Sequence, residues 1–164
     1  MPVTSLSEEE GWEVVRDMYS TILPSLGASS KFPTVLRWAS NTYLGLGMPH
    51  PFIEQGIEQI KMILGHMSQP QTPTGQLLEI SLEQAQVELG LPTPLWQADY
   101  KKHNKLITET WVKSVWKFVS KFGIKLNTAE TVRLPKLREN DRYIMEIAEG
   151  EGFTDQERIS INRC

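Results

Sequence analysis

The chain has 164 residues, of which 40% are hydrophobic and 23% are charged, proportions that are typical of a globular protein and not of a disordered one. No apolar run reaches the length of a membrane span, and the first residues lack the features of a signal peptide. The single cysteine, Cys164, cannot form an internal disulfide. These features predict a cytoplasmic or nuclear protein that does not enter a membrane.

The formal net charge of −3 is unevenly distributed along the chain. Residues 1–98 carry a net charge of −6 and residues 126–164 a net charge of −2. Residues 99–125, in contrast, hold seven lysines against two acids, a net charge of +5. A local basic surface attracts phosphate groups even when the whole chain is acidic. The lysine-rich segment is therefore the first candidate for a binding surface.

The N-terminal half is expected to be helical. Ser7 and Glu10 form a capping box that starts a first helix, which ends near Pro24. A second helix is expected to start at Pro33, a favoured first-turn residue, and to reach Gly45. A third is expected over residues 52–67, where isoleucines and leucine recur on one narrow stripe.

The segment 68–75, SQPQTPTG, is the best linker candidate, either a loop inside one domain or a hinge between two helical halves. The helix predicted after it, 76–89, has two apolar sides, which is typical of a helix packed between two neighbours. One side is formed by Leu78, Leu82, Ala85 and Leu89, and the other by Ile80 with Val87.

The lysine-rich segment contains the sequence WVKSVWKFVSKFGIKL, residues 111–126. Thr108 is the expected N-cap of a helix that Gly123 ends. The apolar residues span an arc of about 160° and the lysines and serines occupy the rest, so most of the aromatic residues are expected in the core.

Trp116 lies at the edge of the apolar arc, where a half-exposed ring bordered by lysines would stack a nucleic-acid base. The alternative is that this ring only covers the rim of the core and that the lysines form an ordinary solvated face. The candidate nucleic-acid-binding residues are Lys113, Trp116, Lys117 and Lys121, with Lys101, Lys102, Lys105 and Lys125 extending the basic field.

Past Gly123, short alternating runs predict one β-hairpin near residues 124–134. A brief helix is expected from Asn140 or Asp141 to Glu149, and Thr154 with Glu157 forms a second capping box. Because this last helix reaches Cys164 without a C-cap, we expect the natural protein to continue. The predicted fold is mainly α, an irregular multi-helix bundle in a single domain, 1–164.

No pattern predicts catalysis. The three histidines, His50, His66 and His103, have no metal-ligand spacing, and the sequence contains no nucleophile elbow, P-loop or dinucleotide-binding motif. No carboxylate pair lies in an apolar setting that would tune a general acid. We expect no cofactor, no metal and no enzymatic activity of this chain alone.

The segment IAEGEGFTDQERIS, residues 147–160, resembles the core of AraC-type helix-turn-helix regulators. Two departures, Glu151 and Arg158, would place charge between the two helices, which is costly unless that charge is paired. This resemblance implies an alternative function, a DNA-binding regulator that uses residues 140–164, with Gln156 and Asn162 contacting bases.

A longer resemblance covers about residues 43–164. YLGLGMPHPFIEQGIEQIKMILGH, TPTGQLLEISLEQAQVELGL, TETWVKSVWKFVSKFGIKL, RENDRYIM and INRC occur in this order. Together they resemble the region downstream of the reverse-transcriptase palm in non-LTR-like retrotransposon proteins of diatoms and other microbial eukaryotes. None of these motifs is catalytic.

This resemblance implies a non-catalytic helical module of a retroelement-derived protein. The module would contact nucleic-acid backbone, or connect a polymerase to later domains. A third reading is a protein-interaction bundle without affinity for nucleic acid. The choice between RNA and DNA, and the oligomeric state, stay open at this point.

Overall fold

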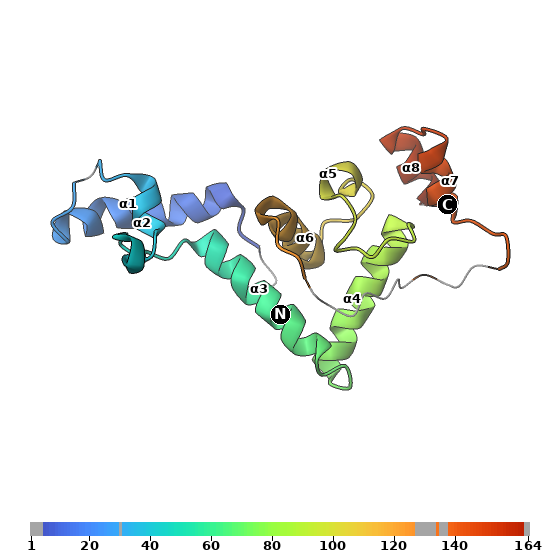
Figure 1. Ribbon diagram of the computed structural model, residues 1–164, viewed down its shortest axis with the longest axis horizontal. Helices are drawn as coiled ribbons and strands as arrows, with labels where there is room; N and C mark the ends of the chain where they lie inside the picture. Colours follow the sequence, from blue (N-terminus) through green and yellow to red (C-terminus); the bar gives the residue numbers. More distant parts are fainter. Residues whose placement is uncertain (1–4, 30, 127–133, 135–137, 163–164) are drawn as a thin grey trace. The chain divides into compact units, whose positions relative to one another are not determined.

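The fold is known from a computed structural model that describes residues 5–29, 31–126, 134 and 138–162. All regular structure among these residues is helical (Figure 1), which confirms the prediction of a mainly α, multi-helix fold. Residues 124–126 form no strand, and residues 127–133 of the predicted hairpin lie outside the described residues. The chain divides into two compact units, Met1–Gln59 and Ile60–Cys164, here called the N-terminal and C-terminal units.

The N-terminal unit begins with α1, Glu8–Ser25. The predicted capping box is present: Ser7 Oγ accepts a hydrogen bond from Glu10 N at 3.2 Å, and Ser7 N donates to Glu10 Oε2 at 2.7 Å. The buried face of α1 consists of Val15, Tyr19 and Leu23. The Tyr19 hydroxyl donates to the carbonyl of Pro49 at 2.5 Å, which ties α1 to the start of the third helix.

The second helix is shorter than predicted. Instead of reaching Gly45, α2 covers only Thr34–Trp38 and is followed by the 3-10 turn η1, Asn41–Tyr43. The chain then folds back along α2, where Leu46 N donates to Leu36 O at 2.9 Å. A side chain at Gly45 would lie 2.0 Å from the carbonyl oxygen of Ala39, so this return path requires glycine. The helical spacing of apolar residues does not predict this contact between the returning chain and α2.

The helices α3, Pro51–Met67, and α4, Pro73–Leu89, are consecutive (Figure 1). The division between the two units falls within α3. The segment 68–75, predicted to be a loop or a hinge, lies inside the C-terminal unit. α4 begins three residues before the predicted Gln76, because Thr72 Oγ1 accepts from Gly75 N at 3.1 Å and caps it.

Four further helices belong to the C-terminal unit. They are α5, Tyr100–His103; α6, Trp111–Phe122; α7, Ile144–Gly150; and α8, Asp155–Asn162. The core joins one face of α4 to the apolar arc of α6. It contains Leu78, Leu82, Ala85, Leu89, Val112, Val115, Trp116 and Val119, with Met145 from α7.

The buried side chain of Gln86 holds the segment that follows α4. Its Nε2 donates to the carbonyls of Leu91 and Thr93 at 2.9 and 3.0 Å, and its Oε1 accepts from Leu95 N at 3.1 Å. The amide thus satisfies three backbone groups of a partly buried loop, and leaving such groups without partners would be costly. Leu91 and Leu95 are thereby held in the core next to α4.

The end of α4 requires a glycine. Gly90 has φ of +66°, and a Cβ placed there would lie 2.4 Å from Cγ of Met145. We expect Gly90→Ala to lower the free energy of unfolding by about 1–2 kcal/mol, because left-handed backbone is costly for alanine. Urea unfolding of the full chain measures this change.

Gly65→Ala is the matched control. Gly65 lies within α3 and a Cβ there would meet no atom within 4 Å, so alanine is expected to raise the free energy of unfolding by about 0.5–1 kcal/mol. Equal stability of the two variants would contradict the assigned backbone conformation at Gly90.

Candidate functional site

The candidate lysines lie on and around α6. Thr110, two residues after the predicted cap, is the N-cap, and its Oγ1 accepts from Lys113 N at 3.3 Å. Gly123 ends the helix with φ of +62°, as predicted. Lys117 and Lys121 are exposed and lie one turn apart on this helix, and Lys125 is exposed just beyond it. The Lys121 ammonium lies 5.8 Å from the centroid of the Phe122 ring.

Lys113 does not belong to this exposed row. Its side chain is buried, and its Nζ donates to the carbonyl of Ile107 at 2.9 Å and to Glu109 Oε1 at 2.5 Å. The ammonium group therefore links α6 to the segment before it through these two bonds. The sequence pattern placed Lys113 on the solvated arc, but it cannot show that residues 107–109 cover this part of the helix.

The expectation of a half-exposed ring at Trp116 does not match the structure. This side chain is only 1% exposed, and its ring meets that of Tyr100 edge-to-face at a centroid distance of 5.0 Å. A ring buried to this degree is not available to a nucleic-acid base. Tyr100, whose ring packs on that of Trp116, belongs to α5, a four-residue helix that was not predicted from the sequence. Burial, together with the charge of Glu109, raises the pKa of the Tyr100 hydroxyl.

Two other lysines are joined to acids on the last two helices. Lys102 on α5 forms an ion pair with Glu149 on α7, and Lys105 pairs with Asp155 on α8 at 2.7 Å. Hydrogen bonds from these lysines are the main reason why the pKa values of Glu149 and Asp155 lie below their usual range. The basic field of residues 99–125 is therefore partly neutralised within the C-terminal unit.

A buried contact lies between these ion pairs. Arg158 on α8 is 5% exposed, and its Nη2 lies 3.0 Å from Nδ1 of His103 on α5. Because a guanidinium group can only donate, His103 accepts through Nδ1 and is neutral in this arrangement. Arg158 Nε is buried and has no hydrogen-bond partner among the described residues.

The pKa of His103 lies below its usual range, first because of burial. The charges of Arg158 and Lys102 lower it further, whereas those of Glu149 and Asp99 raise it. The neutral form of the imidazole is therefore the one that the folded protein favours.

The helix-turn-helix alternative concerns α7 and α8, which pack on each other (Figure 1). Gln156 is exposed, but the side chain of Asn162 donates to the carbonyl of Glu88 on α4. Glu151 is exposed at the end of α7, so only Arg158 brings charge into the interior, where it meets α5. One of the two proposed base-contacting side chains is thus occupied within the protein.

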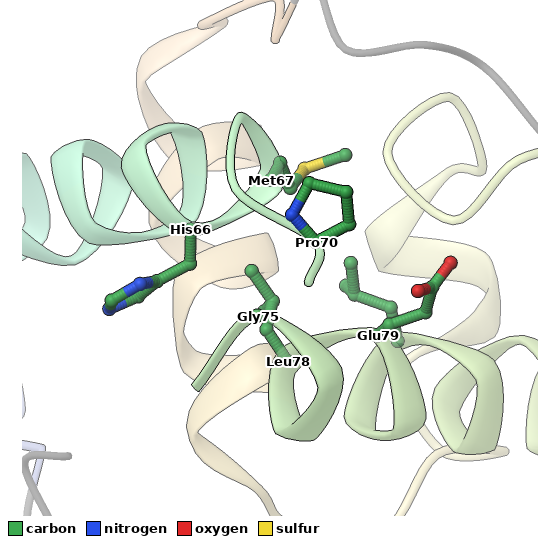
Figure 2. Close-up of a pocket in the computed structure, with 7 residues that line it drawn as sticks. His66, Met67, Pro70, Gly75, Leu78 and Glu79 are labelled. Atoms are coloured by element: carbon green, nitrogen blue, oxygen red, sulfur yellow. The ribbon is translucent and has the colours of Figure 1, made fainter. Parts of the chain in front are cut away.

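Figure 2 shows a small pocket of about 50 Å³ at the turn between α3 and α4. The imidazole of His66 and the carboxylate of Glu79 lie on opposite sides of this view, with Met67, Pro70 and Leu78 between them. At this volume the pocket accommodates little more than water.

A larger hollow of about 440 Å³ lies between the end of α4, residues 105–109 and α8. Its polar lining groups are already used: Glu88 Oε2 accepts from Thr108 N at 2.7 Å, and Asn162 donates to the carbonyl of Glu88. Lys105 and Glu109, which also line it, are ion-paired to Asp155 and Lys113.

Across the described residues, no three side chains of the metal-binding types gather in one place. None of the helices in this part of the chain has the length and apolar character that crossing a membrane requires. Comparisons of the chain with protein-family models, curated proteins and solved structures found no match.

The contacts of Lys113 predict a difference between two lysines of the same helix. We expect Lys113→Met to lower the free energy of unfolding by about 1–3 kcal/mol, because the buried carbonyl of Ile107 loses its donor. Lys117→Met, at an exposed position, is expected to stay within about 0.5 kcal/mol of the wild type. Urea unfolding at fixed pH and salt compares them, and indistinguishable variants would refute the buried position of Lys113.

The buried histidine predicts that stability falls in mildly acidic solution. Because the folded protein lowers the pKa of His103, the unfolded chain takes up this proton first as the pH falls. The contribution of His103 to the free energy of unfolding is fully present above the ordinary histidine pKa of about 6.5. It is lost as the pH falls through the lower pKa of the folded protein.

Urea midpoints measured between about pH 7.5 and 5.5 test this prediction, since the window brackets the ordinary histidine pKa. We expect His103→Gln to flatten the dependence of these midpoints on pH relative to the wild type. Equal slopes for wild type and His103→Gln would show that this imidazole does not carry the effect.

Proposed function

We propose that the chain is a non-catalytic helical module of a retroelement-derived protein and that it contacts nucleic-acid backbone through exposed lysines of the C-terminal unit. The contact is carried by Lys117 and Lys121 on α6, extended by Lys101 and Lys125. These four side chains are exposed, and Lys117 and Lys121 lie one turn apart on the helix. The exposed pair on α6 is the observation that supports the proposal most directly.

The chemistry of these side chains favours phosphate over bases. Lysine ammonium groups are point charges that attract phosphate without reading sequence. Trp116 lies inside the core, so its ring is not available to stack on a base. The expected binding is therefore non-specific and strongly dependent on salt.

The resemblance of residues 43–164 to the region beyond a reverse-transcriptase palm supplies the biological setting. In that setting the polymerase carboxylates belong to another part of the protein, and this module lies beside the template and primer. The helix-turn-helix alternative has less support, because Asn162 is bound to α4 and Arg158 faces His103.

Salt-dependent binding to fluorescein-labelled single-stranded RNA and duplex DNA, followed by fluorescence anisotropy, tests the proposal. Lys117→Gln/Lys121→Gln/Lys125→Gln removes three phosphate contacts. We expect the slope of log K against log salt to fall by about 2–3 for either nucleic acid. The ratio of the two affinities decides between RNA and DNA.

A control variant removes the same charge elsewhere. Arg16, Lys31 and Arg138 are exposed and lie outside the lysine-rich segment, so their replacement by Gln is expected to leave the salt slope close to that of the wild type. If both triple variants lost the same amount of salt slope, net charge alone would explain the effect and the lysine surface on α6 would not. Absence of binding by the wild type at low salt would reject nucleic-acid contact altogether.

A further inference from the structure

The outward side of α4 carries an exposed apolar stripe. Leu77, Ile80 and Val87 are 56%, 60% and 51% exposed, although the opposite side of the same helix is buried in the core. The spacing of apolar residues in this segment predicts two apolar sides and a neighbour on each. Among the described residues only one side has its neighbour.

The stripe has the spacing of a helix-packing seam. Leu77, Ile80, Gln84 and Val87 follow one another at intervals of three, four and three residues, the repeat of the positions that face a partner helix in a coiled coil. A partner helix would bury these side chains, and apolar seams of this kind are energetically unfavourable when left in water.

The charged residues beside the stripe are all acidic, which indicates the charge that a partner helix should carry. α4 contains no lysine or arginine between Pro73 and Leu89, and Glu83 and Glu88 occupy the positions that flank the seam. Glu79 is exposed on the same side as Glu83, one turn before it. Glu88 accepts hydrogen bonds from Thr108 N and from the side-chain amide of Gln84, which leaves Glu79 and Glu83 as the exposed acids of α4.

A second copy of the same helix does not complement this face. In a parallel pair Glu83 would lie opposite Glu88 of the copy, and like charges at these flanking positions disfavour pairing. In either orientation α4 offers a copy no basic residue. A helix with apolar residues on one side and lysines or arginines beside them complements both the stripe and its charge.

We propose that the outer face of α4, formed by Leu77, Ile80, Gln84 and Val87 with Glu79 and Glu83, binds a basic amphipathic helix of a partner protein. This surface uses none of the lysines assigned to nucleic acid, so the proposal stands or falls independently of the proposed function.

Two synthetic peptides test the proposal with the full chain. Each has about three heptads with leucine at the seam positions, flanked by lysine in one peptide and by glutamate in the other. Fluorescence anisotropy is expected to show the lysine peptide binding at least about tenfold more tightly than the glutamate peptide. Equal affinities would overturn the charge complementarity, and no binding of either peptide would overturn the proposal.

Substitutions on the stripe locate the binding surface. Ile80→Gln/Val87→Gln is expected to lower the affinity for the lysine peptide at least about tenfold. Ile144→Gln is the matched control, because Ile144 is 67% exposed and lies on α7, away from the stripe. The affinity of this variant for the lysine peptide should stay within about twofold of the wild-type affinity. Equal effects of the two variants would place the peptide elsewhere. All these positions are exposed, and circular dichroism confirms that each variant is folded.

A charge reversal provides a gain of binding that misfolding cannot imitate. Glu79→Lys/Glu83→Lys is expected to invert the preference, so that the glutamate peptide becomes the tighter ligand. Retention of the original preference would overturn the assignment of these two acids. Light scattering tests whether a second copy of this chain occupies the face instead. A wild-type dimer that becomes a monomer in Ile80→Gln/Val87→Gln would show this and would overturn the proposal.

Discussion

The three hydrogen bonds of Gln86 are the constraint on which the C-terminal unit depends. They hold residues 91–95 against the end of α4, where a single buried amide serves backbone groups that have no helical partner. The chain continues from this loop into α5, which packs on α6 and sets Tyr100 against Trp116. The loop that Gln86 holds thus leads to the segment whose Tyr100 packs on Trp116.

The same arrangement places three lysines of residues 99–125 in ion pairs. Lys102, Lys105 and Lys113 are paired with acids, and two of these pairs join α5 and the segment after it to α7 and α8. Partly exposed pairs of this kind add little stability each. Their clearer effect is electrostatic, because they remove positive charge from a segment whose sequence alone looks uniformly basic.

The last two helices are held to the C-terminal unit from several directions. Arg158 meets His103 on α5, Asn162 meets the backbone of α4, and the pairs with Lys102 and Lys105 lie beside them. A guanidinium group whose only hydrogen-bond partner among the described residues is a neutral imidazole makes this attachment sensitive to the protonation of that imidazole. Polar side chains on the inner side of α8 thus serve its attachment, while the outer side of α4 keeps an apolar stripe in solvent.

The sequence by itself determined the features that depend on residues within one or two turns. The capping boxes of Ser7 with Glu10 and Thr154 with Glu157, the glycine that ends α6 and the buried face of α4 all follow from local spacing, and the structure contains each of them. These features are predictable because their partners lie a few residues apart in the chain.

Only the tertiary structure decided the contacts between distant segments. The return of residues 46–48 along α2 shortens a predicted helix, and Tyr100 covers a ring that local periodicity left at the rim. Lys113 lies on the polar arc of its helix by angle, yet the carbonyl of Ile107 and the carboxylate of Glu109 enclose it. Helical periodicity assigns a direction to each side chain, but exposure depends on which other segment packs there, and that information is not local.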